Sequence, residues 1–369
     1  MFFDYARYYL TFGLQLMTAA GLLLGGAWAW LGLSTLFVFA VADELLPLDL
    51  APRRMNNQAL ASVPLWLCTL SGPLLVLLLA WTAAQGNFAG LDWAGAVIST
   101  AWLSVIGYVP SSHELYHQRS WLAQFVGNYG QVVYLDCTRS VGHTVGHHID
   151  VGTKEDSDTA PRGKDLYSFT LKALVDSTIL SSKIESDALE KRGYSRWSWR
   201  HRAWKAVLAQ LVFHAVAFAI AGWTGVAAAL ASMLVARLWV ESFNYFQHYG
   251  IVRAPGKPVA RRHLWNHLGY LTRPVAMEIT NHADHHLDSY IPYYKLQPDP
   301  TAIRMPNVFL CFLAALVPPL WHRYIIMPAL KEWDLKFASA EEREIARAQN
   351  LAAGWPDWFS EAPQQAVAA

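Results

Sequence analysis

Nine of the 14 histidines in the sequence fall into four short clusters whose spacing suits metal binding. On an α-helix, residues at i, i+3 and i+4 share one face, so a cluster can direct two or three imidazoles towards one point. Imidazole is a ligand for iron, zinc, copper or nickel. Nine nitrogens are too many for one ion and suit two, with four or five each. The candidate ligands are His113, His117, His143, His147, His148, His248, His282, His285 and His286.

Residues near these clusters are candidates for holding the ligands in place. A metal-bound histidine usually has its second ring nitrogen fixed by a hydrogen bond, so polar neighbours matter. We predict such a supporting role for Glu114, Asp150, Glu241, Glu278, Asp284, Asn266 and His267. The remaining histidines lack partners at ligand spacing or lie outside the four clusters.

The first cluster has two chemical interpretations. The run from His113 to His117 reads HExxH, the zinc-protease pattern in which the glutamate is the general base. That reading needs one more ligand and leaves six clustered histidines unexplained. Two metals in an all-nitrogen site beside a membrane suit oxygen activation on an apolar substrate better. Trp66 and Trp102 are candidate linings for its pocket.

The composition is that of a membrane protein. Of 369 residues, 54% are hydrophobic and only 15% are charged, against about 25% charged in soluble domains. Six apolar stretches approach the roughly 20 residues needed to cross a bilayer. The net charge of +1 gives no case for nucleic-acid binding, and three cysteines without a CxxC motif support neither a disulfide framework nor a thiolate metal site. The predicted crossings lie near residues 8–24, 27–46, 60–84, 91–109, 204–223 and 224–246.

The distribution of Lys and Arg predicts the orientation of these crossings. Turns on one side carry no basic residue, whereas the other side receives a large insertion (110–203) and the C-terminal region (247–369). By the positive-inside rule, that second side is cytoplasmic, and so are both termini. We therefore predict a single all-α, polytopic domain over 1–369 whose four histidine clusters gather at the cytoplasmic face.

Taken together, the clusters resemble the membrane alkane hydroxylase/xylene monooxygenase family. The family pattern HELxH, HxxxHH, NYxxHYG and HxxHH occurs here in order, beginning at His113, His143, Asn244 and His282. Gln247 and the Ile279-Thr-Asn281 run are typical of the branch that oxidises aryl methyl groups in xylene, toluene or cymene. Gly142 and Gly146 look more like the alkane branch, so linear alkanes stay open as substrates.

The resemblance implies a non-haem di-iron monooxygenase in the inner membrane of a bacterium. It would hydroxylate a methyl group to a primary alcohol with O2, with electrons from an NADH-dependent flavin/[2Fe–2S] reductase. The alternatives are an alkane 1-monooxygenase fed by rubredoxin, a fatty-acyl desaturase, an intramembrane zinc metalloprotease and a metal transporter. Basic residues of the histidine-bearing face would steer an acidic electron carrier. They include Arg139, Lys154, Arg162, Arg261 and Arg262.

Overall fold

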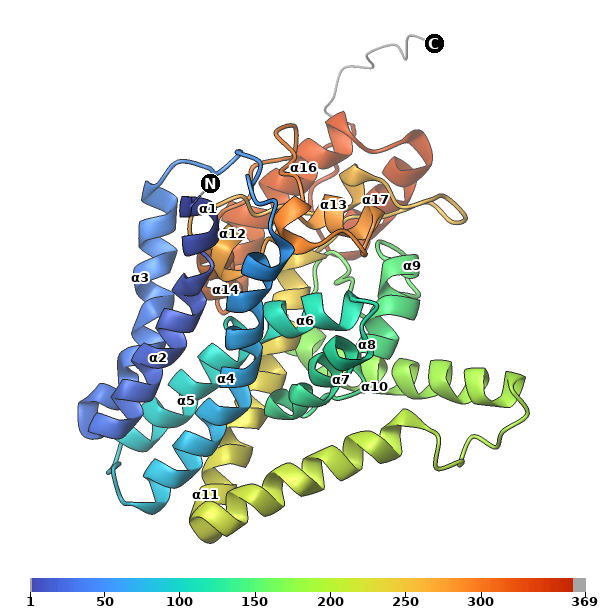
Figure 1. Cartoon of the computed structure of the whole chain (residues 1–369). Coiled ribbons are helices and arrows are strands. Elements are labelled where there is room, and N and C mark those ends of the chain that lie inside the picture. Colours follow the sequence, from blue (N-terminus) through green and yellow to red (C-terminus); the bar gives the residue numbers. More distant parts are fainter. Residues whose placement is uncertain (1, 361–369) are drawn as a thin grey trace.

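A computed structural model describes residues 2–360, which form helices and connecting loops without a β-strand (Figure 1). The longer helices are α2 (Tyr9–Leu24), α3 (Leu31–Leu45), α4 (Gln58–Ala84), α5 (Asp92–Val105), α10 (Leu166–Lys191), α11 (Arg202–Gln247) and α17 (Ala340–Ala352). The shorter α-helices are α1 (Phe2–Ala6), α6 (Val109–His117), α7 (Trp121–Tyr129), α8 (Arg139–Val141), α9 (His148–Asp150), α12 (Thr272–Val275), α13 (His282–Leu287), α14 (Val308–Ala315), α15 (Pro318–Leu320) and α16 (Met327–Lys336). Two π-helical segments are η3 (Gly142–His147) and η6 (Trp321–Ile326), and 3₁₀ turns are η1 (Gly26–Trp30), η2 (Gly130–Tyr134), η4 (Arg261–His263) and η5 (Tyr293–Lys295).

An elongated bundle of apolar helices forms one part of the molecule. Within the described residues, four helical runs are long and apolar enough to cross a membrane: Gly26–Leu45, Gln58–Ala84, Asp92–His117 and Arg202–Gln247. Helix α11 packs against α4 and α5, and α2 packs against α4. Helices α12–α17 gather towards the end of the bundle that is uppermost in Figure 1, and the histidine-bearing helices α6 and α9 lie below α13.

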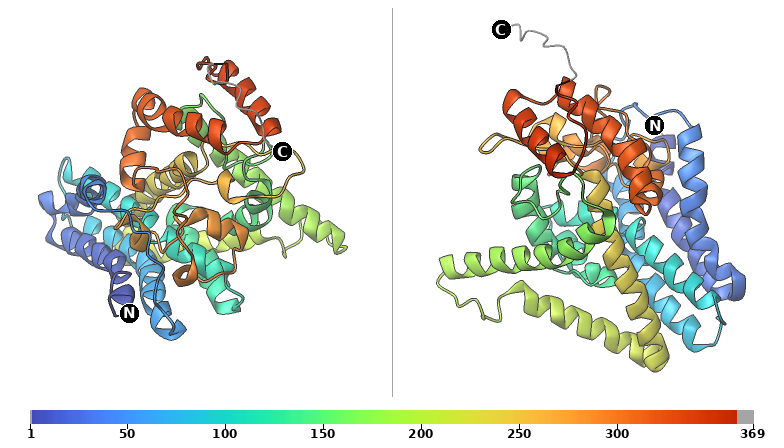
Figure 2. Two further views of the ribbon diagram at one scale, coloured as in Figure 1. Left: turned by 90° about the horizontal axis from the view of Figure 1, so that it is seen from above. Right: turned by 180° about the vertical axis from the view of Figure 1, so that it is seen from behind.

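Helix α11 is two helices that meet at a break. Gly222 has φ 58° and ψ −159°, a conformation that glycine adopts without the strain of a Cβ atom. The first arm starts away from the bundle at Arg202 and reaches its lower end at this break, and the second arm then runs up along α4 and α5 (Figures 1 and 2). The sequence predicted a turn one residue later, between Trp223 and Thr224.

The predicted crossings map onto these helices with shifted boundaries. The stretches at 27–46 and 60–84 coincide with two of the four apolar runs. The crossing predicted to end at residue 109 continues through α6 to His117, so the first histidine cluster belongs to the same helical run. Helix α2 has 16 residues, which is short of the span length, and the predictions for 204–223 and 224–246 fall on the single run of α11. Six crossings are therefore more than the four helical runs within residues 2–360 that meet the length and hydropathy of a membrane span.

The cytoplasmic insertion predicted for 110–203 folds in two parts. Its first part, α6 to α9, packs around the histidines. Its second part, α10, extends sideways from the molecule beside the first arm of α11 (Figure 1). Helix α10 is capped at its start by Asp165, whose carboxylate accepts hydrogen bonds from the backbone N–H groups of Tyr167 and Ser168.

Candidate metal centre

The structure brings all nine clustered histidines together in two adjacent groups, which we call site A and site B. Within each group, one ring nitrogen per residue lies within 4.8 Å of those of the others. The ring of His148 in site A stacks on that of His286 in site B, with centroids 4.3 Å apart. Site A consists of His113, His117, His143, His148 and His285, and site B consists of His147, His248, His282 and His286.

The second histidine cluster is divided between the two sites. Segment η3 is π-helical, with i→i+5 hydrogen bonds, and this wider turn lets residues five apart approach one another. His143 and His148 consequently meet, with their Nε2 atoms 3.0 Å apart. His147, at i+4, turns into site B instead. This cluster therefore contributes histidines to both sites instead of aiming all three at one of them.

Helix α13, which carries the fourth histidine cluster, is also divided between the two sites. His282 and His286, at i and i+4, share a face and belong to site B, whereas His285 belongs to site A. His248 follows the second arm of α11, and its Nε2 lies 2.6 Å from Nε2 of His282. His113 on α6 completes the contact across site A, with its Nε2 2.9 Å from that of His143.

These distances fit nitrogen ligands around a metal ion. With a nitrogen–metal bond of about 2.1 Å, the value for imidazole on zinc, two ligands at a right angle stand about 3.0 Å apart. The Nε2 contacts in site A are 2.9 and 3.0 Å. Several other buried ring nitrogens lack a hydrogen-bond partner in the described structure: Nε2 of His117, His147 and His285, and both ring nitrogens of His286. Buried polar atoms are rarely left unpaired, so the donor set fits two metal ions.

The protonation state of these histidines also suits metal binding. Burial lowers the pKa of His143, His148, His285 and His286 well below the usual histidine value, and neighbouring imidazoles lower it further. Burial lowers the pKa of His282 to about 3. Imidazole must be neutral to bind a metal, so these residues are in the ligand form at neutral pH.

Site B has three histidines whose Nδ1 atoms are held by neighbouring groups. Nδ1 of His248 donates to the carbonyl of Asn244 at 3.2 Å, and Nδ1 of His282 donates to the carbonyl of Ile279 at 3.1 Å. Nδ1 of His147 lies 2.9 Å from a carboxylate oxygen of Asp156. In each case Nε2 is left to face the site.

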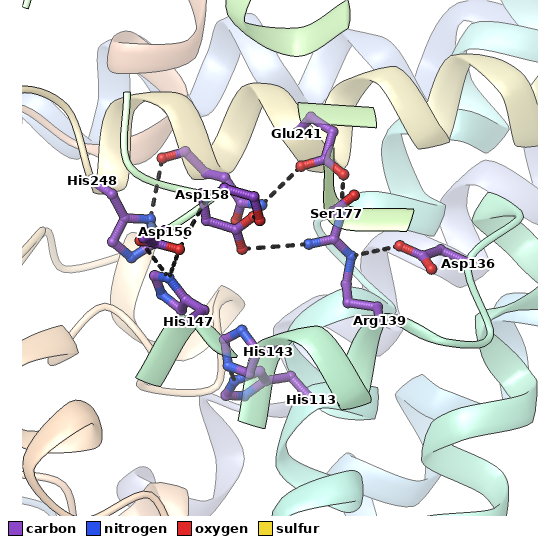
Figure 3. A network of polar contacts seen from close by, with 12 residues as sticks. His113, Asp136, Arg139, His143, His147, Asp156, Asp158, Ser177, Glu241 and His248 are labelled. Atoms are coloured by element: carbon purple, nitrogen blue, oxygen red, sulfur yellow. Dashed lines mark hydrogen bonds and ion pairs between the residues drawn. The ribbon is translucent and has the colours of Figure 1, made fainter. Parts of the chain in front are cut away.

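A buried charge network connects Asp156 to the bundle (Figure 3). The backbone N–H of Asp158 donates to Asp156, and the Asp158 carboxylate lies 3.9 Å from Arg139. Arg139 forms an ion pair with Glu241 on α11, which also pairs with Arg237. Asp158 is also close enough to His143 and His147 to form a further potential ligand group with them.

Three of the predicted supporting residues lie against the ligand-bearing backbone. Glu241 accepts a hydrogen bond from the Asn244 side chain at 3.0 Å, and the Asn244 carbonyl in turn holds His248. Asn266 accepts from the backbone N–H of Ala283 in α13 at 3.1 Å. Glu278 accepts from Asn281, one residue before His282, at 2.8 Å.

The other predicted supporting residues point to different partners. Glu114 accepts a hydrogen bond from the backbone of Tyr293, and Nδ1 of His267 donates to the carbonyl of Pro306. Asp284 pairs with Arg261, and Asp150 belongs to the wall of a surface groove. Sequence reasoning missed Asp156 and Asp158, because an Asp-Ser-Asp run in a loop has no helical spacing that ties it to a histidine.

An apolar cavity borders both sites at the end of the bundle. Neither predicted lining residue lies on its wall. Trp102 is buried behind the wall, where its ring packs near Phe243 and its indole N–H donates to Thr35. Trp66 packs against the cluster of Leu65 and Leu115. The apolar residues of the wall are Val105, Ile106, Val109, Pro110, Val240, Phe243, Ala276, Ile279 and Val308.

Comparison with known proteins shows which family the chain belongs to. Residues 91–302, which contain all nine clustered histidines, match the sequence profile of the fatty acid desaturase family. The chain is 38% identical to the xylene/toluene monooxygenase hydroxylase component XylM of Pseudomonas putida, over 96% of this chain and 97% of that protein. It is 27% identical to alkane 1-monooxygenase 2 of Pseudomonas aeruginosa, over 88% of this chain and 89% of the relative. The chain therefore belongs to the membrane alkane hydroxylase/xylene monooxygenase branch of that family.

Proposed function

We propose that the protein is a di-iron monooxygenase that hydroxylates the methyl group of an aromatic hydrocarbon of the xylene, toluene or cymene type. The observation that carries this proposal is the division of nine histidines, seven of them buried and two half-buried, into two groups that both border an apolar cavity. Similarity over nearly the whole length of a xylene/toluene monooxygenase component supports the choice of substrate. The product is the primary alcohol.

Iron is the metal that we propose for both histidine sites. Two bound iron ions would supply the activation of O2 and its cleavage. The five histidines of site A and the four of site B would hold them, with Asp156, Asn244 and Ile279 fixing the imidazoles of site B. An intramembrane zinc protease gains no support, because Glu114, its required base, is bonded to the backbone of Tyr293.

The chain's own residues would place the methyl group beside the metals. The cavity wall includes His113, His143, His248 and His282. The rest of the wall is mostly apolar and includes Phe243. An aromatic hydrocarbon in this cavity would have its ring against apolar side chains and one methyl group near the histidines, while water would find few hydrogen-bond partners on the apolar side.

Terminal hydroxylation of linear alkanes is the second candidate. Relatives named alkane 1-monooxygenase support it, although the identity is lower. Turnover of p-xylene and of octane should be compared in membranes supplied with a reductase and NADH. Conversion of p-xylene to its benzylic alcohol at a higher kcat/KM supports the proposal, and a clear preference for octane contradicts it.

The electron carrier would bind in a surface groove beside site B. The groove, of about 1360 Å³, lies between the 149–164 loop, α10 and the 251–258 loop. Asp156 lies on its wall and is hydrogen-bonded to His147, so the groove comes within one side chain of a site B ligand. Exposed lysines on the wall outnumber its exposed carboxylates, which favours an acidic carrier such as a [2Fe–2S] domain. These lysines are Lys154, Lys164, Lys172, Lys183 and Lys257.

Two of the basic residues expected to steer the carrier are buried and cannot contact it. Arg139 is buried against Glu241, and Arg162 is buried in a bidentate pair with Asp334. Lys154 and Arg261 are exposed enough to meet a partner. We therefore assign the steering role to the groove lysines and to Arg261.

The membrane arrangement that accompanies this function has six crossings and cytoplasmic termini. The two arms of α11, which meet at Gly222, would be the fifth and sixth crossings, and α2 would be the first. The histidine sites and the carrier groove would then face the cytoplasm of a bacterial inner membrane, where NADH is available.

A further inference from the structure

The loop between α10 and α11 combines basic and aromatic residues in an unusual density. Residues 191–205 read KRGYSRWSWRHRAWK, with six Lys or Arg and no Asp or Glu. We call this segment the basic–aromatic tip. Its aromatic side chains are exposed to solvent, although such large rings are usually mostly buried. Their exposed fractions are 41% for Tyr194, 76% for Trp197, 72% for Trp199 and 51% for Trp204.

The tip lies far from both metal sites. It joins the outer end of α10 to the first arm of α11, at the edge of the molecule in Figures 1 and 2. It therefore cannot contribute a ligand or line the cavity beside the sites. The electron-carrier groove involves α10 only up to Lys183, so the tip lies beyond that surface as well.

The tip also lies at the start of an exposed apolar helix. The first arm of α11 begins within the tip, and it exposes Leu208 by 60% and Leu211 by 64%. An apolar face of this kind is stable in contact with hydrocarbon. If the arm lies in the bilayer, its first residues are at the level of the lipid headgroups, where Trp and Tyr concentrate.

Most of the positive charge of the tip is left without a protein partner. Arg196 pairs with Glu190 and Arg202 pairs with Glu185. Among residues 2–360, no carboxylate forms an ion pair with Lys191, Arg192, Arg200 or Lys205. Arg200 instead lies over the rings of Tyr194 and Trp199, at 4.6 and 5.1 Å from their centroids. Stacking of this kind holds the guanidinium beside the rings and leaves its edge open to an anion.

From this combination we infer that the basic–aromatic tip binds the headgroups of anionic phospholipids. The free cations would contact lipid phosphates, and the rings of Trp197, Trp199 and Trp204 would insert among the headgroups. Each basic residue near an anionic surface contributes about 1 kcal/mol, which corresponds to a factor of about five in occupancy. The inference needs no monooxygenase activity and stands apart from the proposed function.

Hydrogen exchange of the full chain in lipid nanodiscs tests this inference. We expect the backbone of 191–205 to exchange more slowly in discs containing phosphatidylglycerol than in discs of phosphatidylcholine alone. The difference should shrink in high salt, because screening weakens contacts with charged lipid. Equal exchange in the two kinds of disc would overturn the inference.

A charge-neutralised variant makes the test specific to the tip. The triple variant Arg192→Gln/Arg200→Gln/Lys205→Gln should lose the protection by phosphatidylglycerol, up to about a hundredfold if the three contributions add. The matched control, Lys295→Gln/Arg304→Gln/Lys336→Gln, removes the same charge from exposed positions elsewhere and should retain it. Full protection in the tip variant, or an equal loss in the control, would contradict binding at the tip.

Discussion

Nδ1 of His147 lies 2.9 Å from Oδ2 of Asp156, and this hydrogen bond leaves Nε2 of His147 to face site B. Thr159 donates to the same carboxylate at 2.6 Å, so the acid is fixed from two sides. The pairing raises the pKa of His147 against the opposing effect of burial. A carboxylate in this position strengthens the imidazole as a metal ligand and fixes its tautomer.

Replacing this carboxylate should weaken site B without emptying site A. We expect Asp156→Asn to lower metal affinity or turnover by about 10- to 100-fold, the usual effect of losing such a partner. Iron content and the rate of alcohol formation measure the effect. The control is Asp187→Asn, an exposed carboxylate of α10 outside the carrier groove, and it should leave both unchanged. Normal iron content and rate in Asp156→Asn would show that Asp156 does not support His147 as a metal ligand.

The division of α13 between the sites predicts two distinct metal-loss variants. His285→Ala should deplete site A and His286→Ala should deplete site B, so each protein should keep one of its two irons in part. Mössbauer spectra of the remaining iron should differ between the two variants. His214→Ala, a histidine outside both groups that bonds to the carbonyl of Gln210, is the control. Identical spectra from the two variants would show that the assignment to sites A and B is incorrect.

Close packing of α10 on η3 predicts a compensating pair of substitutions. A Cβ atom at Gly142 would lie 2.6 Å from Oγ of Ser181, so Gly142→Ala forces the Ser181 side chain or the adjoining backbone to shift. We expect a loss of about 1–3 kcal/mol in stability together with reduced iron content. Adding Ser181→Gly should restore much of the iron content by making room.

The matched control for this pair is Gly13→Ala, where an added Cβ meets nothing within 4 Å. Thermal unfolding and metal analysis of all four proteins provide the comparison. A Gly142→Ala protein with normal iron content, or a double variant no better than the single one, would contradict close packing as the reason for this glycine.

The cavity wall predicts which residues set substrate size. Ile279→Phe should narrow the cavity and lower kcat/KM for p-cymene more than for toluene, because the isopropyl group needs the space. Trp66→Phe, at a position away from the wall, should leave the ratio of the two substrates unchanged. An unchanged ratio in Ile279→Phe, or a shift in Trp66→Phe, would place the substrate elsewhere.

Disrupting a buried ionic cluster around Glu278, just before α13, should cost much stability. Glu278, with φ 59°, receives hydrogen bonds from Arg53, Arg273 and Tyr8. Glu278→Gln would break a buried ion pair to each of Arg53 and Arg273 and leave Asp49 as their remaining carboxylate partner, at a cost of about 3–5 kcal/mol. Unfolding in detergent, monitored by denaturant titration, measures this cost. The exposed change Glu332→Gln is the control, and an equally small effect in both would refute the structural role of Glu278.

The choice of nine histidines was predictable from spacing, whereas their division between two sites was not. Clusters at i, i+3 and i+4 identify residues that can share a helix face, and all nine reach the same centre. His147 and His148 enter different sites at the π-helical turn η3. The spacing of the histidines in the sequence does not indicate that this turn is π-helical. The HxxHH cluster divides in a similar way because its helix lies between the two sites.

The fold was predictable in its apolar runs and less so in its connections. Long apolar stretches predict the helices of the bundle, and the structure follows them closely in α4. The break at Gly222 depends on a backbone conformation that neighbouring apolar residues do not specify. Asp156 is brought to His147 by the packing of a loop, so its role required the three-dimensional structure.

Metal analysis of the purified protein distinguishes a di-iron centre from a single zinc site. We expect two iron ions per chain in protein that converts p-xylene to its benzylic alcohol, with the alcohol oxygen derived from labelled O2. A protein that is active with a single zinc ion and no iron would contradict this expectation.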